Sequence, residues 1–148
     1  DYYTDNKILT KVIPNLDERF INYCQMWREY DDKTRILQKW KYNRLALYFS
    51  AFLPHPTLII SRNQYDKVGL YDINYKIAAD HDLILRLTFL YKGIEHNEIL
   101  TVMTQGGESS KNLQLSLNEF TKVTINNGIP TILAELIKYI KCVWWKLN

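Results

Sequence analysis

The chain has 148 residues, the length of one ordinary domain, and 47% of them are hydrophobic, so it can bury a core and is not a disordered tail. The net charge of +3 gives no strong nucleic-acid signature. Cys24 and Cys142 form no metal or redox motif, and nothing predicts a signal peptide or a membrane span, so we expect a cytoplasmic setting. Because the chain opens abruptly at Asp1 without an initiator Met, we expect a fragment of a longer protein.

The first part of the chain predicts a strand and a long helix. Residues 8–13 fit a short strand that Pro14 stops. Asn15 and Glu18 have the form of a capping box. Apolar side chains then follow at helical spacing, which predicts an amphipathic helix of about four turns with an aromatic stripe in the core: Leu16, Phe20, Tyr23, Trp27 and Tyr30.

Basic residues between positions 33 and 44 are interleaved with Trp40 and Tyr42. Such a run can bind phosphates or nucleic acid, and it can equally be the solvated face of a helix. We favour the solvated helix face, and we expect no nucleic acid among the partners of this chain.

The middle of the chain contains clearer local signals. After a break at Pro54-His55-Pro56, residues 57–60 form a short apolar run rich in β-branched side chains, which predicts a buried strand. Ser61 and Gln64 predict a capping box that opens a short helix, and Gly69 is placed to end that helix.

A central helix is expected over residues 80–92, closed by Gly93, after a turn at Asp72-Ile73-Asn74. It begins with Asp80-His81-Asp82. Aspartate is favoured in a first turn because its oxygens accept free backbone N–H groups and meet the positive end of the helix dipole. Asp82 and Arg86 are four residues apart and can pair along one helix face.

Residues 94–104 predict one or two strands, and the loop over residues 105–110 follows them. Its two glycines, Gly106 and Gly107, would let the backbone approach a phosphate closely, although a simple turn explains them as well. A helix is expected over residues 113–126, ending at Gly128. Alternating short strands and helices predict an α/β fold.

The last segment, residues 130–147, predicts an amphipathic helix with Pro130 at its start. Lysines and tryptophans border its apolar face. This combination suits the membrane interface, where such side chains lie between the hydrocarbon region and the aqueous headgroup region. The alternative is a helix docked on its own domain or on a second copy of the chain, and the sequence leaves both open. The apolar face consists of Ile132, Leu133, Leu136, Ile137, Ile140, Val143 and Trp144.

Several blocks of the sequence, taken together, resemble one enzyme family. The blocks occupy residues 54–62, 68–72, 77–87 and 106–110, and the similarity continues at 118–120 and 126–129. In this order they are similar to the C-terminal, acceptor-side half of bacterial family 2 glycosyltransferases with the GT-A fold, of the capsule and exopolysaccharide type. Tyr3-Thr4-Asp5 is similar to the Tyr-Gly-Asp that precedes this half in the family, with Thr in place of Gly.

The resemblance implies a short mixed sheet with flanking helices. Residues 1–128 would form the acceptor-binding part of the glycosyltransferase domain, and residues 129–148 an amphipathic C-terminal helix. It also implies an inverting, hexosyltransferase-type reaction in which a sugar passes from a nucleotide-sugar donor to a hydroxyl of a sugar or lipid-linked acceptor. The reaction would serve cell-surface polysaccharide synthesis. The protein would lie in the cytoplasm or peripherally on the inner face of the membrane.

The resemblance further implies roles for single residues. Asp80 corresponds to the general base, the second residue of the family's common Glu-Asp pair, with Ala79 where the Glu often stands. His55 resembles the residue on the acceptor side of the cleft. Asp82 and Arg86 are expected at the substrate site mainly as residues that orient the helix and the preceding loop. The loop with Gly106, Gly107 and Ser109 resembles the segment that closes near the diphosphate.

Asp80-His81-Asp82 also has the letters of the D-x-D motif that holds Mn²⁺ or Mg²⁺ on the donor diphosphate. In the family that motif belongs to the N-terminal half, and the present triplet matches the later motif instead. We therefore expect the divalent metal in the full-length parent and no metal on this chain. Without the nucleotide-binding half we expect no activity from this chain alone, and exposed strand edges make a homodimer plausible.

Overall fold

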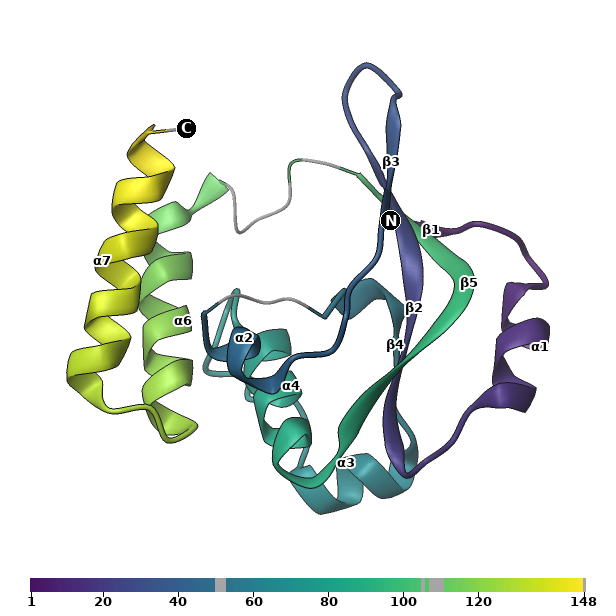
Figure 1. Cartoon of the computed structure of the whole chain (residues 1–148), viewed down its shortest axis with the longest axis horizontal. Coiled ribbons are helices and arrows are strands. Elements are labelled where there is room, and N and C mark those ends of the chain that lie inside the picture. Colours follow the sequence, from purple (N-terminus) through teal and green to yellow (C-terminus); the bar gives the residue numbers. More distant parts are fainter. Residues whose placement is uncertain (50–52, 105, 107–110, 148) are drawn as a thin grey trace.

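The computed structural model describes residues 1–49, 53–104, 106 and 111–147, with side chains described as far as residue 143. The chain forms a mixed α/β fold, as the sequence predicts, with a short sheet and flanking helices (Figure 1). The elements in chain order are β1 (Tyr2–Tyr3), α1 (Ile8–Val12), the 3-10 helix η1 (Ile13–Asn15), β2 (Phe20–Glu29), β3 (Arg35–Gln38), α2 (Arg44–Phe49), the 3-10 helix η2 (His55–Thr57), β4 (Leu58–Ile59), α3 (Arg62–Val68), α4 (Ala79–Leu90), β5 (Lys92–Thr104), α6 (Leu113–Asn126) and α7 (Thr131–Leu147).

The sheet is mixed and has five strands in the order β1-β5-β2-β3, with β4 also paired to β2. The central strands β2 and β5 run parallel, from Phe20 opposite Lys92 to Glu29 opposite Thr104, with register shifts near Gln25. All other pairs are antiparallel. Because β2 pairs with three other strands, it organises the sheet.

Helices cover both faces of the sheet, and each side has its own core. Helix α1 lies on one side, while α2, α4, α6 and α7 lie on the other (Figure 1). Under α1, Cys24 and Leu100 of the sheet meet the buried side chains of that helix. On the α4 side, the larger core joins the sheet to the helices through Ile21, Tyr23, Leu47, Leu83, Leu87 and Val123, among others.

The predictions for the first part of the chain are wrong. The predicted helix after Asn15 is the strand β2, whose residues 21–26 are all buried. A strand buried on both faces has no polar side, so its apolar side chains can mimic helical spacing. The predicted strand at 8–13 is instead helix α1, in which Ile8 and Val12, one turn apart, both face the core.

The basic segment 33–44 is not a helix either. It forms β3 and an irregular connection to α2. Tyr23 fixes that connection, because its hydroxyl donates to the carbonyl of Trp40 (2.9 Å) and accepts the backbone N–H of Tyr42 (3.0 Å). The rings of Trp40 and Tyr42 pack against the larger core.

The helices predicted after residue 60 from capping and periodicity are confirmed. Ser61 and Gln64 form the predicted capping box of α3, which ends at Gly69 with a φ of 82°. Helices α4, α6 and α7 lie within a few residues of their predicted bounds. Gly93 does not close α4, because α4 ends at Leu90 and Gly93 belongs to β5. Among the described residues, no helix combines the length and apolar character needed to cross a bilayer.

Candidate active site

Asp80 lies in the first turn of α4 and reaches the surface. Its side chain is 36% exposed. One oxygen, Oδ1, accepts the backbone N–H of His81 at 2.7 Å, which fixes the carboxylate at the helix start. The other oxygen, Oδ2, lies 3.9 Å from Nδ1 of His55, longer than a hydrogen bond. Within the described part of the chain, Oδ2 therefore has no hydrogen-bond donor and is free to accept a proton from a bound molecule.

His55 links Asp80 to Tyr71. Its Nε2 lies 2.9 Å from the hydroxyl of Tyr71, and the two rings meet edge to face. Burial, with smaller contributions from a hydrogen bond to Tyr65 and the charge of Asp80, raises the pKa of Tyr71 to about 12. The phenol therefore stays neutral and can donate to Nε2. In that arrangement the imidazole carries its proton on Nδ1, facing Asp80.

A cavity of about 380 Å³ adjoins His55 on the side of β1. Tyr2 and Tyr3 are half-exposed at its edge, and Arg35 donates to the Tyr2 hydroxyl at 2.8 Å, which fixes that ring. Thr101 is buried, and its hydroxyl has no hydrogen-bond partner among the described residues. Aromatic faces with nearby polar groups and a volume of this order suit a small polar ligand that has an apolar face, such as a sugar ring. The lining residues are Asp1, Tyr2, Tyr3, His55, Pro56 and Thr101.

Glu119 of α6 holds the backbone that leads into α4. Its carboxylate accepts the backbone N–H groups of Lys76 (3.0 Å), Ile77 (2.8 Å) and Ala78 (3.0 Å). Burial opposes the charge, but these bonds outweigh it and lower the pKa of Glu119. No role is assigned to Glu119 from the sequence, although a charged residue on the buried side of α6 is a usable signal. Glu119 fixes the turn on which Asp80 stands.

Asp82 and Arg86 form an internal pair, away from the cavity beside His55. Arg86 Nε donates to Asp82 Oδ2 at 2.8 Å, and Asn127 donates to Asp82 Oδ1 at 3.0 Å. Arg86 also donates to the backbone carbonyls of residues 68–70, which precede Tyr71. The two side chains thus orient α4 and the loop that precedes Tyr71. They also line a separate cavity of about 400 Å³ that reaches α6.

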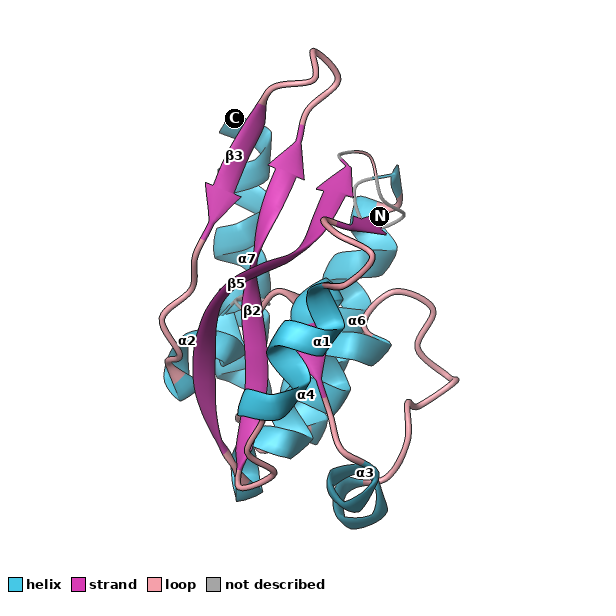
Figure 2. Cartoon of the chain, turned by 90° about the vertical axis from the view of Figure 1, so that its right-hand side faces the viewer, coloured by secondary structure: helices cyan, strands magenta, loops and turns pink. Residues whose placement is uncertain are grey.

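The glycine loop is described only at Gly106. This residue is exposed, has a φ of 99°, and has no atom within 4 Å of a Cβ placed on it. It follows β5, whose last residue, Thr104, donates its N–H to the Asp1 side chain at 3.3 Å. Figure 2 shows the N-terminus and the α3–α4 connection on the same side of the molecule. Gly107 and Ser109 lie outside the described residues.

The Asp80-His81-Asp82 triplet does not fit a metal site. Both oxygens of Asp82 are used by Arg86 and Asn127. His81 is buried and stacks on Phe120 with ring centroids 4.4 Å apart. The described residues contain no cluster of three His, Cys, Asp or Glu side chains that could hold an ion. Of the two carboxylates in the triplet, only Asp80 has an oxygen without a hydrogen-bond donor among the described residues.

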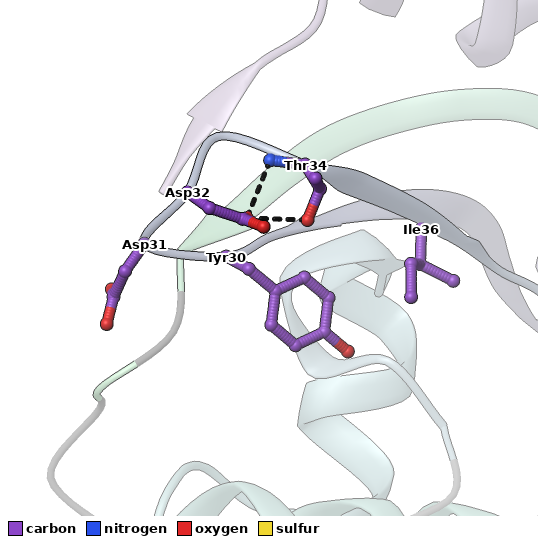
Figure 3. A pocket seen from close by; sticks show the side chains of 5 residues that line it. All are labelled: Tyr30, Asp31, Asp32, Thr34 and Ile36. Carbon is purple, nitrogen blue, oxygen red and sulfur yellow. Dashed lines mark hydrogen bonds between the residues drawn. The ribbon is translucent and has the colours of Figure 1, made fainter.

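A third cavity, of about 390 Å³, lies at the β2–β3 turn and is explained by the turn itself. Figure 3 shows Asp32 bonded to the backbone N–H and hydroxyl of Thr34, at 3.0 and 2.6 Å. Asp31 points away from the ring of Tyr30 (Figure 3). These acidic residues close a hairpin in which Lys33 adopts a φ of 67°, and they add no second candidate site.

Comparison with known proteins adds no family. No protein-family model matches the chain, and a search of curated proteins finds no match. Any functional assignment depends on the side chains around Asp80 and on the resemblance of the sequence blocks.

Proposed function

We propose that this chain is the acceptor-side half of an inverting glycosyltransferase and that Asp80 is its general base. The observation that supports this best is the position of Asp80. Its carboxylate is partly exposed at the start of α4, with one oxygen fixed and the other free, beside a histidine that lines a cavity of suitable size. The order of the family-like sequence blocks supports the same proposal.

In the proposed reaction, a sugar ring of the acceptor occupies the cavity between Tyr3 and His55. Its hydroxyl transfers a proton to Asp80 Oδ2 as the oxygen attacks the anomeric carbon of the donor sugar. The bond from that carbon to the diphosphate breaks on the opposite face, so the configuration inverts. General base catalysis of this kind contributes typically about 10²–10⁴-fold to the rate.

His55 would orient the acceptor rather than take its proton. With Tyr71 donating to Nε2, the proton on Nδ1 is available to a hydroxyl oxygen bound between His55 and Asp80. Because burial raises the pKa of Tyr71 to about 12, the phenol keeps the proton that it donates to Nε2. The expected effect of removing His55 is weaker acceptor binding, with a smaller effect on turnover.

The donor nucleotide and its Mn²⁺ or Mg²⁺ would be bound by the other half of the parent protein. Such an ion, when bound, neutralises charge on the leaving diphosphate. The parent would act on a sugar or lipid-linked acceptor for cell-surface polysaccharide, in the cytoplasm or at the inner face of the membrane.

The test is Asp80→Asn in the parent enzyme, with the exposed Asp66 of α3 changed to Asn as the matched control. We expect kcat to fall by about 10²–10⁴-fold for Asp80→Asn, with donor affinity within about twofold of wild type. The control should retain its turnover. Near wild-type turnover of the Asp80→Asn enzyme would remove Asp80 from this role.

A further inference from the structure

Helix α7 exposes its most apolar side. The exposed fractions reach 87% for Ile132 and 68% for Tyr139. The exposed side chains recur at intervals of three and four residues, so they form one continuous stripe along the helix. We call this the α7 stripe; it consists of Ile132, Leu133, Leu136, Tyr139, Ile140 and Val143.

The opposite side of α7 packs on α6 and includes lysines. Ala134 and Ile137 are buried there. Lys141 lies with its Nζ 3.0 Å from the ring centroid of Phe120, and burial lowers its pKa to about 7. Burying a lysine while isoleucine and leucine side chains of the same helix stay exposed to water is unfavourable, because the hydrophobic effect favours the opposite arrangement. The α7 stripe therefore fits a partner outside the described chain.

The charge of this region indicates what kind of partner that is. Residues 111–147 contain five lysines and two glutamates, a formal net charge of +3 that lies between +2 and +3 near pH 7, because Lys141 is only partly protonated there. Both glutamates are engaged within the fold. Glu119 accepts three backbone N–H groups, and Glu135 lies 3.5 Å from Lys138. The α6–α7 hairpin is thus cationic with an apolar outer stripe.

We propose that the α6–α7 hairpin lies flat on an anionic lipid bilayer, with the α7 stripe inserted at the boundary between headgroups and acyl chains. Figure 1 shows α7 at the edge of the molecule, with α6 between it and the sheet, so the stripe can meet a plane. From residue 132 to 143 the stripe is about 17 Å long, at 1.5 Å per residue. Apolar insertion and attraction to anionic headgroups act together on such a helix.

A second copy of the chain fits this surface less well. Pairing two α7 stripes would bring two hairpins of net positive charge together, and like charges oppose that association. An anionic bilayer complements the same charge. The surface does not involve Asp80, so this inference stands or fails independently of the proposed reaction.

The experiment is cosedimentation of the full 148-residue chain with vesicles. One set contains phosphatidylcholine with phosphatidylglycerol, and the other contains phosphatidylcholine alone. We expect binding to the anionic vesicles that weakens as salt is raised, and roughly tenfold weaker binding to the neutral ones. Ile140→Glu should weaken binding to anionic vesicles by roughly tenfold or more, since it removes one inserted side chain. Leu45→Glu is the matched control, because Leu45 is 72% exposed on α2, and it should change binding by less than about twofold.

Leu136→Ser separates the loss of apolar contact from the added negative charge and should also weaken binding. Circular dichroism confirms that each variant is folded. The proposal is overturned if the wild-type chain does not bind anionic vesicles, or if Leu45→Glu weakens binding as much as Ile140→Glu. It is also overturned if sedimentation velocity finds a wild-type dimer that Ile140→Glu converts to a monomer, because a second copy would then cover the stripe.

Discussion

Glu119 offers a sharp test of how the fold positions Asp80. Its carboxylate accepts three consecutive backbone N–H groups, at residues 76–78, immediately before α4. In Glu119→Gln one side-chain oxygen can still accept from two of them, but the amide NH₂ would face the third N–H. One partly buried donor, the N–H of Lys76, then loses its partner, and the remaining bonds lose the charge that strengthens them.

The expected loss follows from these bonds. A hydrogen bond to a charged group contributes about 1.5–3 kcal/mol, and an unsatisfied buried donor costs about 1–3 kcal/mol. The contributions are not additive, so we expect Glu119→Gln to lower the free energy of unfolding by about 2 kcal/mol near neutral pH. Glu119→Ala, which leaves all three N–H groups without the carboxylate, should lower it further.

The pH dependence gives an independent readout. The bonds to residues 76–78 hold the pKa of Glu119 below its ordinary value of 4.5, despite burial. A depressed folded-state pKa stabilises the protein above the unfolded pKa, and this stabilisation is lost as pH falls through the folded value. The difference in free energy of unfolding between the wild type and Glu119→Gln should therefore shrink as pH falls below 4.5, because the wild type then loses the contribution of the charged carboxylate.

The assay is urea denaturation followed by circular dichroism between neutral pH and the acid range. Glu135→Gln is the matched control, because Glu135 is 54% exposed on the neighbouring α7 and pairs with Lys138. Its effect should stay below about 0.5 kcal/mol. Two results together would refute the claim that Glu119 holds the backbone before Asp80: Glu119→Gln is as stable as Glu135→Gln, and its free energy of unfolding changes with pH in parallel with that of the wild type.

Two further stability predictions follow from the core. Gly93→Ala should cost about 1–3 kcal/mol, because its Cβ would lie 2.4 Å from Tyr42 Cδ2 and 3.1 Å from Tyr23 Cε1. Adding Tyr42→Ala should remove most of this cost in a double-mutant cycle, and purely additive losses would contradict the contact with Tyr42. His81, whose ring nitrogens have no partner among the described residues, has its pKa lowered to about 3 by burial. Between pH 6.5 and 5 only the unfolded chain protonates this histidine, so the free energy of unfolding of the wild type should decrease as pH falls below 6.5. In His81→Phe this decrease should be smaller. Urea midpoints of the wild type and His81→Phe that change in parallel between pH 6.5 and 5 would contradict the prediction.

Prediction from sequence succeeded where the signal is local. The capping box of Ser61 and Gln64 and the Gly69 stop lie within a single helix, so residues a few positions apart are sufficient to find α3. The long periodic helices α6 and α7 were found for the same reason. The exposure of the α7 stripe could not be read from its periodicity, because α7 contacts α6 with the side that carries Lys141.

Prediction failed where distant residues decide the structure. Residues 21–26 become a strand because β5, some seventy residues later, pairs with them in parallel. Their polar members, Asn22 and Gln25, are buried as well, so the alternation expected of a half-exposed strand is absent. No window of sequence around Tyr23 contains that information, and the aromatic spacing favoured a helix instead.

In the candidate site, too, residues with a local sequence signal were predicted and residues placed by long-range packing were not. Asp80 and His55 were singled out by their sequence blocks, and the structure brings them within 3.9 Å of one another. Tyr71, Glu119 and the cavity side of β1 were not assigned roles, because their relation to Asp80 arises only from packing. Asp82 and Arg86, expected at the substrate site mainly to orient the helix and the preceding loop, pair with each other, and Arg86 also donates to the backbone before Tyr71.

The most direct measurement of the central claim is the single-turnover rate of sugar transfer from pre-bound donor in the parent enzyme, compared between Asp80→Asn and Asp82→Asn. The two carboxylates lie in the same turn of α4, but only Asp80 has an oxygen free for an acceptor proton. We predict that Asp80→Asn lowers the rate by about 10²–10⁴-fold at unchanged stability. Asp82→Asn should lower stability and leave the rate of the folded enzyme near wild type. Equal rates for the two variants, or a slower rate for Asp82→Asn, would contradict the account.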